Sequence, residues 1–383
     1  MKRRKLESYL LRVISKEVTG LVPFLITGLL NVLEIVYLLL LKLQRSMVKR
    51  AGLLAPVISV GNLVAGGTGK TPTVVWLVNF LKECGYTPAV LTRGYRGGVG
   101  AEGLLLTRSE LEKYTPDFTG DEPYLLAYLL PGTVIAVGRD RYRTALKALT
   151  HHPEIDILVM DDGFQYWKLE RDLDILLLDA TRPFGNGHLL PRGTLREPIA
   201  GLKRAGVILL TRTAQMDPAE IAKIAEYLRQ YHPDAPVGVV REEHSALIPL
   251  GSRRQEDDAH PAANYLNGKK VAAITAIGNP RQFLASLESL GAEVGYFKSY
   301  PDHYQWEESE IENLIATLKD WGFEDLIVTG KDGVKLAAYL EKFRRRGLNC
   351  LMLSLEYMID DEKVRSRIAE VSPRKVVAEP CAF

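Results

Sequence analysis

The stretch 56–72, PVISVGNLVAGGTGKTP, constrains the fold more than any other part of the chain, because a short apolar run leads into a glycine-rich turn ending in Gly-Lys-Thr. The apolar run predicts a buried strand, and the apolar spacing after Thr71 predicts a helix that stops at Gly85. A tight turn between a strand and a helix directs backbone N–H groups inward, and the helix N-terminus adds a partial positive charge. The stretch therefore predicts a turn that holds phosphate.

The lysine and threonine that end this turn indicate what each would contact. Lys70 is expected to reach the β- and γ-phosphates, and the Thr71 hydroxyl is expected to ligate Mg²⁺. The strict pattern G-x-x-x-x-G-K-[ST] requires glycine at position 64, where the chain has Val64. A glycine-rich turn that only lets a strand and a helix pack closely is therefore the alternative. The residues that we expect to bind the nucleotide are Gly66, Gly67, Thr68, Gly69, Lys70 and Thr71.

Size and composition are those of a globular protein with two cores. The chain has 383 residues, of which 46% are hydrophobic and 25% charged, which is enough for two domains after an N-terminal extension. The net charge of +2 gives no reason to expect nucleic acid as a partner. The three cysteines are widely spaced, which favours a reducing cytosol over a disulfide scaffold or a zinc site.

The N-terminal 50 residues combine a basic start, Lys-Arg-Arg-Lys, with a long apolar run. A helix from Val18 to Leu43 would be about 39 Å long, which is enough to cross a bilayer. Pro23 and Glu34 within the run, and basic residues on both sides of it, argue against crossing. A secretory signal is excluded because no small-residue cleavage site follows and because an ATP-using domain must stay in the cytosol.

The polar residues of this run fall on one narrow helical stripe, interrupted by Leu38: Thr27, Asn31, Glu34, Lys42 and Arg45. The rest of the circumference is almost wholly apolar, which is typical of a helix lying in a membrane interface. We therefore expect peripheral or monotopic attachment. A single membrane span and a helix packed on the protein itself are the alternatives.

Apolar strand patterns alternate with helical patterns along most of the chain, which predicts the α/β class. We expect an N-terminal membrane-associating helical segment (1–50) and a P-loop NTPase-like core with a parallel sheet and flanking helices (51–235). An extended, polar connection (236–266) would then lead to a second, smaller α/β domain (267–383).

Candidate functional residues follow the predicted strands of the core. Arg93 and Tyr95 lie in the loop of segment 88–97, and at the carboxyl end of a strand such a loop overlooks the ligand crevice. Asp161 and Asp162 follow an apolar strand, where a carboxylate can hold the Mg²⁺ bound to the nucleotide phosphates. A solvated turn is the alternative for the loop that contains Arg93.

Three further candidates lie in polar loops. Arg196 and Glu197 belong to the stretch LLPRGTLREP, and Asp121 begins an apolar helix, where it could serve only as an N-cap. His303 lies in YPDHY, between a strand and a helix of the second domain; a proton carrier and a structural or surface histidine are both open.

Taken together, these motifs resemble one family, the tetraacyldisaccharide 4'-kinases, which phosphorylate the lipid A disaccharide precursor. The resemblance rests on GNLVAGGTGKTP (61–72), LTRGYRG (91–97), GDEP (120–123), DDGFQ (161–165), LLPRGTLREP (189–198), PDHY (301–304) and TGKD (329–332). Two places depart from the family pattern. Tyr166-Trp167 stand where the family usually has His-Arg, and Gly330 stands where it has Glu.

The resemblance implies a two-domain kinase with its active site in the cleft. Lys70 and Thr71 would bind ATP and Mg²⁺. Asp161, Asp162 and Glu197 would form the acidic surroundings of the metal and the transition state, with Thr71, Asp162 and Glu197 as the metal ligands.

The same resemblance implies that Asp121 and His303 activate the sugar hydroxyl, so that the catalytic set is Asp121, His303, Lys70 and Asp161. Arg93, Tyr95 and Arg196 would hold substrate or phosphate.

We therefore expect a lipid kinase at the cytoplasmic face of the inner membrane. Its substrates would be ATP with Mg²⁺ and the disaccharide 1-phosphate lipid, and it would need no nucleic acid and no obligate protein partner. A membrane-associated P-loop switch ATPase or GTPase is the main alternative, although Ala65 stands where its loop would have lysine and the chain has no NKxD motif. A cytosolic small-molecule kinase is disfavoured by the apolar segment 18–43.

Overall fold

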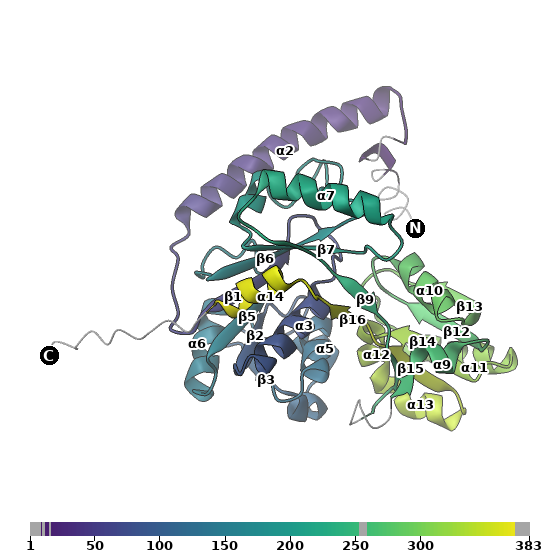
Figure 1. The fold of residues 1–383 in the computed structure, drawn as a ribbon. Helices are drawn as coiled ribbons and strands as arrows, with labels where there is room; N and C mark the ends of the chain where they lie inside the picture. Colours follow the sequence, from purple (N-terminus) through teal and green to yellow (C-terminus); the bar gives the residue numbers. More distant parts are fainter. Residues whose placement is uncertain (1–8, 10–11, 15–16, 253–258, 372–383) are drawn as a thin grey trace.

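The computed structural model describes residues 9, 12–14, 17–252 and 259–371. Two α/β domains lie side by side, and a long N-terminal helix lies along the outside of the first (Figure 1). Within each domain helices cover the sheet, and apolar side chains of strands and helices form the core.

The first domain contains an eight-stranded sheet in the order β3-β4-β2-β5-β1-β6-β7-β8. All neighbours are parallel except β3, which pairs antiparallel with β4 at one edge. The strands are β1 (Val57–Asn62), β2 (Pro88–Thr92), β3 (Leu104–Leu106), β4 (Val134–Val137), β5 (Ile157–Asp161), β6 (Leu173–Asp179), β7 (Val207–Thr211) and β8 (Val237–Val239). Strand β1 lies inside the sheet and runs parallel to both of its neighbours. The glycine-rich turn that follows β1 therefore lies beside the carboxyl ends of these strands.

The helices of this domain connect the parallel strands. They are α3 (Lys70–Glu83), α4 (Pro116–Thr119), α5 (Asp121–Leu129), α6 (Arg141–His151) and α7 (Pro218–Tyr231), with 3₁₀ turns η1 (Arg108–Lys113) and η2 (Ile199–Arg204). Leu77 and Leu81 of α3 are fully buried against the sheet. The apolar spacing in this segment therefore corresponds to the side of the helix that packs on the core.

The second domain is built on a six-stranded sheet in the order β11-β10-β15-β14-β12-β13. Its strands are β10 (Ala246–Pro249), β11 (His260–Pro261), β12 (Lys270–Thr275), β13 (Glu293–Ser299), β14 (Asp325–Thr329) and β15 (Asn349–Leu353). Its helices are α9 (Ala262–Leu266), α10 (Pro280–Ser289), α11 (Glu308–Asp320), α12 (Gly330–Leu336), η3 (Ala337–Tyr339) and α13 (Leu340–Arg345).

The chain passes between the domains twice, at β9 (Arg241–Glu243) and β16 (Glu356–Met358), which pair antiparallel. After β16 the chain returns to the first domain. There α14 (Glu362–Ala369) buries Val364 and Ile368 completely in the first core. The second sheet is thus inserted in the first domain, whereas the sequence predicted that 267–383 would be one unit and that the first domain would end at 235. Nothing in the local pattern of α14 indicates which of two cores its apolar side joins.

Helix α2 (Leu21–Met47) is continuous, because Pro23 lies in its first turn, where a missing N–H costs nothing. It contacts the first domain through Glu34, which lies on the polar stripe, and through Tyr37, which lies beside the stripe. Most of its large apolar residues, among them Phe24 and Leu25, are exposed, whereas Ile26, Leu30, Leu38 and Leu41 are half-buried. Of the described helices, α2 alone is long and apolar enough to cross a membrane, by length and composition.

Candidate active site

The turn between β1 and α3 adopts the backbone conformation that its glycines allow. Gly66 and Gly69 have φ of 127° and 82°, which other residues rarely adopt, and α3 begins at Lys70. The Thr68 side chain points back into the turn, where its hydroxyl accepts a hydrogen bond from Asn62 Nδ2 at 2.9 Å. A Cβ atom on Gly69 would lie 2.0 Å from the Tyr357 hydroxyl of β16. The turn therefore lies directly against the connection between the domains.

Arg212 holds the outer side of this turn, and no motif in the sequence indicated it. It follows β7 with φ of 58°; Nη1 pairs with Asp179 Oδ2 at 2.6 Å, and Nη2 donates to the Gly67 carbonyl oxygen. Its backbone N–H donates to Glu242 of β9 at 3.3 Å. The turn is thus held in place by the ends of β6 and β7 and by the connection between the domains.

Two adjacent carboxylates at the end of β5 lie in different environments. Asp161 is 3% exposed, and burial, together with Glu122 and Asp162, raises its pKa to about 7 against the opposing effect of Lys70. Burial also opposes ionisation of Asp162, but Lys70 and Arg196 outweigh it and lower the pKa of Asp162. Asp162 Oδ1 lies 3.7 Å from Lys70 Nζ and 2.7 Å from Arg196 Nη1. The structure thus joins Lys70, Asp162 and Arg196 in one charged network.

Glu197 lies behind this network with its carboxylate already paired. It is 6% exposed, accepts a hydrogen bond from Gln165 Nε2 at 2.8 Å and pairs with Arg204 Nη2 at 2.9 Å. Direct contact of Glu197 with a metal requires Arg204 to turn away.

The second domain brings His303 against Asp121 of the first. His303 Nδ1 lies 3.2 Å from Asp121 Oδ2, and the same oxygen lies 2.8 Å from Lys335 Nζ. Burial opposes ionisation of Asp121, but hydrogen bonds from His303 and Lys335 lower its pKa. Asp121 is therefore a charged partner across the domain boundary in addition to the first residue of α5.

Of the predicted substrate-binding residues in the 88–97 loop, Tyr95 borders this pair. Tyr95 is exposed, and its ring centroid lies 5.8 Å from that of His303. Arg93 is exposed as well. Arg141 is 6% exposed near Asp161 and Asp162, and burial lowers its pKa; it lies at the start of α6, and the sequence assigned it no role.

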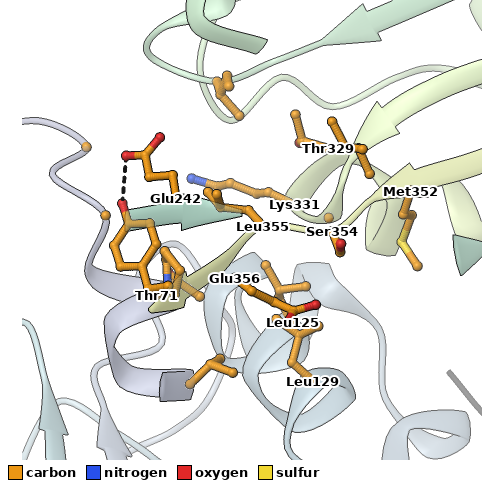
Figure 2. Close-up of a pocket in the computed structure, with 18 of the residues that line it drawn as sticks. Thr71, Leu125, Leu129, Glu242, Thr329, Lys331, Met352, Ser354, Leu355 and Glu356 are labelled. Atoms are coloured by element: carbon orange, nitrogen blue, oxygen red, sulfur yellow. Dashed lines mark hydrogen bonds between the residues drawn. The ribbon is translucent and has the colours of Figure 1, made fainter. Parts of the chain in front are cut away.

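A cavity of about 730 Å³ separates the turn from the second domain. Its walls include Lys70, Thr71 and Asp161 on one side and Lys331 on the other, with apolar side chains such as Leu125 between them. Figure 2 shows Lys331 reaching into the cavity from the second domain, with Thr71 on the opposite wall. The volume suits a nucleotide-sized ligand.

The donor atoms at the turn fit a phosphate-bound magnesium ion. The Thr71 hydroxyl and the carboxylates after β5 are hard oxygen ligands, and Asp161 is an acid without a direct cationic partner among the described contacts. No group of three or more His, Cys, Asp or Glu side chains suited to a metal occurs in the described ranges. A site that completes its ligand set with phosphate oxygens and water agrees with this finding.

A phosphate loop after an inner parallel strand, with acids after the neighbouring strand, defines a P-loop phosphotransferase. Comparison with known proteins then identifies the family: the family described as tetraacyldisaccharide-1-P 4'-kinase matches residues 26–372, and the chain belongs to it. This confirms both the resemblance and the fold expected from the sequence.

Individual relatives agree. The tetraacyldisaccharide 4'-kinase of Halothermothrix orenii is 35% identical over 365 residues, covering 92% of this chain and 94% of the relative. That of Syntrophus aciditrophicus is 38% identical over 332 residues, covering 84% of each. The crystal structure of LpxK from Aquifex aeolicus in complex with ATP has a TM-score of 0.70 and 29% identity, covering 90% of this chain and 98% of that one.

Proposed function

We propose that this protein is an ATP-dependent kinase that transfers the γ-phosphoryl group to the 4'-hydroxyl of tetraacyldisaccharide 1-phosphate in lipid A biosynthesis. Membership of the 4'-kinase family supports the activity. The observation that carries the proposal is a phosphate loop that lines a cavity between two domains, together with an Asp–His pair whose chain neighbours, Glu122 and Asp302, line the same cavity. A switch protein that only binds and hydrolyses a nucleotide has no need of this pair.

The phosphate loop would bind ATP. Backbone N–H groups from Gly66 to Thr71 would surround the phosphates, and Lys70 would neutralise charge that develops on the γ-phosphoryl oxygens. A bound Mg²⁺ would neutralise further charge on the phosphates. Its proposed ligands are Thr71 and Asp162, with Asp161 beside them. Glu197 would become the third protein ligand once Arg204 moves away from it. Positioning and charge are the main requirements of phosphoryl transfer.

Asp121 and His303 would activate the acceptor. With Nδ1–H donating to Asp121, the His303 ring has its lone pair on Nε2, where it accepts the proton of the sugar hydroxyl. The hydroxyl oxygen then bonds to the γ-phosphorus as the bond to the ADP oxygen breaks. Because base and phosphate loop belong to different domains, closure would complete the site and limit transfer to water.

The lipid would enter from the side of α2. The exposed apolar residues of α2 would lie in the cytoplasmic leaflet of the inner membrane, while the polar stripe of α2 would hold the helix on the protein. Arg93, Tyr95 and Arg196 would contact the headgroup of the substrate. In this proposal segment 1–50 anchors the enzyme, the P-loop core that begins at residue 51 and includes α14 binds ATP, and the domain inserted between β9 and β16 supplies the base.

Transfer of labelled γ-phosphate from ATP to the purified disaccharide 1-phosphate lipid in detergent micelles tests the proposal. Wild-type protein should make labelled lipid, and Lys70→Ala and Asp121→Ala should not. ATP hydrolysis without lipid phosphorylation, unaffected by Asp121→Ala, would overturn the proposal in favour of the switch ATPase.

A further inference from the structure

Two lysines of α12 face the Asp–His pair. Lys331 and Lys335 are four residues apart, so they lie on the same side of the helix, one turn apart. Helix α12 packs against α5, the helix that Asp121 begins. A side chain of the second domain therefore reaches each member of the pair.

Lys335 is buried, which is rare for a lysine unless its charge is paired. Its side chain is 5% exposed, and its Nζ lies 2.8 Å from Asp121 Oδ2 and donates to the Tyr304 carbonyl oxygen at 3.2 Å. Tyr304 directly follows His303. One ammonium group thus joins the carboxylate of the first domain to the loop that carries the proposed base.

Asp121 Oδ2 serves two donors at once, Lys335 Nζ and His303 Nδ1. At the far side of the ring, His303 Nε2 lies 3.3 Å from Lys331 Nζ, which also lies near Asp302 and Glu122. As a hydrogen bond, this contact needs a lone pair on Nε2, because an ammonium group can only donate. Asp302 Oδ2 also faces Nε2, but at 3.9 Å it lies beyond hydrogen-bond distance. The contacts on both sides therefore agree on one tautomer, with the proton on Nδ1.

We infer that Lys335 is a positioning residue for the reaction: it holds Asp121 charged and oriented, so that Asp121 keeps the His303 proton on Nδ1 and the basic nitrogen directed away from it. The inference rests on the proposed function and extends it to a residue outside the Asp–His pair. Lys335 acts through Asp121 and does not touch the substrate.

The alternative is a lysine that only holds the domains together, and pH dependence distinguishes the two. The charged groups that face Asp121 are His303, Lys335 and Lys331, with Glu122 next in the chain. Without Lys335, the buried Asp121 carboxylate loses a cation that opposes its protonation. Its pKa should rise, so the coupled Asp121–His303 pair should take up a proton at higher pH, and the acidic side of the rate profile should move to higher pH with it. A purely structural loss would be the same at every pH.

The experiment is a pH profile of lipid phosphorylation with the full-length protein in detergent. For Lys335→Met we expect kcat to fall by about 10- to 100-fold at pH 7, the KM for ATP to stay within about 2-fold, and the acidic limb to move up by about one pH unit. Lys335→Arg retains the charge and should keep the limb near its wild-type position. Lys342→Met is the matched control, because Lys342 pairs with Glu308 and Glu312 on the surface of the same domain.

A wild-type pH profile for Lys335→Met, with or without an overall loss of rate, would overturn the inference. If Lys335→Met does not fold, Asp121→Asn with and without Lys335→Met provides the test, since the double variant removes both members of the buried pair. Adding Lys335→Met should then leave kcat of Asp121→Asn unchanged, and a further drop of more than about 3-fold would contradict the inference. Failure of the proposed function would be seen separately, as absence of labelled lipid with wild-type protein.

Discussion

The hydroxyl group of Tyr37 donates a hydrogen bond of 2.8 Å to the carbonyl oxygen of Arg196, 159 residues away in the sequence. Tyr37 belongs to the exposed apolar helix, and Arg196 pairs with Asp162 beside Lys70. The helix that we propose to lie in the membrane is therefore two contacts away from the proposed site of phosphoryl transfer.

This contact predicts that Tyr37→Phe weakens lipid phosphorylation without unfolding the protein. One lost hydrogen bond is worth about 1 kcal/mol, so kcat/KM for the lipid should fall by about 2- to 5-fold. Thr27→Val is the control on the same helix, because Thr27 Oγ1 donates only within the helix, to the Pro23 carbonyl oxygen. Equal kinetics for the two variants would show that α2 does not influence the site through Tyr37.

The exposed face of α2 predicts binding to lipid surfaces. Leu25 and Leu29 are each 60% exposed, and replacing both by glutamate should reduce cosedimentation with vesicles of anionic phospholipid by at least about 10-fold, because each leucine contributes roughly 1.5–3 kcal/mol when buried in lipid. Leu146→Glu makes the same change at a 42% exposed leucine on α6 and should leave vesicle binding unchanged. Full retention by the double variant would count against attachment through α2.

The approach of Tyr357 to the phosphate loop predicts that Gly69 is unusually sensitive to substitution. Gly69→Ala combines a left-handed backbone, costing about 1–2 kcal/mol, with a clash against the Tyr357 ring and hydroxyl. ATP binding, followed by calorimetry, should be lost. Gly66→Ala meets no neighbouring atom within 4 Å and should show only backbone strain, while Gly100→Ala, which has open space and no left-handed φ, should bind ATP normally. Wild-type affinity in Gly69→Ala would show that the loop moves away from β16.

Burial of Asp161 predicts that the metal-free protein is less stable at neutral than at acidic pH. The folded-state pKa is about 7, above the ordinary value of 3.8, so the folded state binds the proton more tightly than the unfolded chain. This stabilisation is complete below about pH 4 and is lost as the pH rises toward 7, at no more than about 1.4 kcal/mol per pH unit.

Thermal unfolding in EDTA tests this expectation. Between pH 5 and 7.5, roughly the range of that titration, the wild-type melting temperature should fall further than that of Asp161→Asn. The variant should be the more stable protein at the upper end while failing to phosphorylate lipid. Parallel pH curves for the two proteins would contradict a buried, protonatable Asp161.

Local patterns were sufficient to predict most of the first sheet. The apolar runs at β1, β5, β6 and β7 have the composition of strands buried on both faces, and the turn at Gly66 and Gly69 has a backbone that few other residues allow. The edge strand β3 is short and was not predicted, because three leucines in a row fit a strand or a helix equally well.

Contacts between distant segments could not be predicted in the same way. Tyr357 meets the phosphate loop, and Glu242 meets Arg212 behind that loop, only because the chain passes twice through the boundary between the domains, and no local pattern encodes these passages. Lys335 did carry a signal, since it lies one helical turn after Lys331 of the TGKD motif. That signal has meaning only once Asp121 is known to lie opposite.

The return of α14 to the first core has a consequence for the order in which the protein matures. Val364 and Ile368 are among the last described residues to be synthesised, and both are fully buried against strands of the nucleotide-binding domain. During translation that domain therefore remains open along one side until the second domain has been made. A ribosome that stops before α14 would release a chain that has the complete apolar helix α2 but lacks part of the hydrophobic core of its phosphate-binding domain.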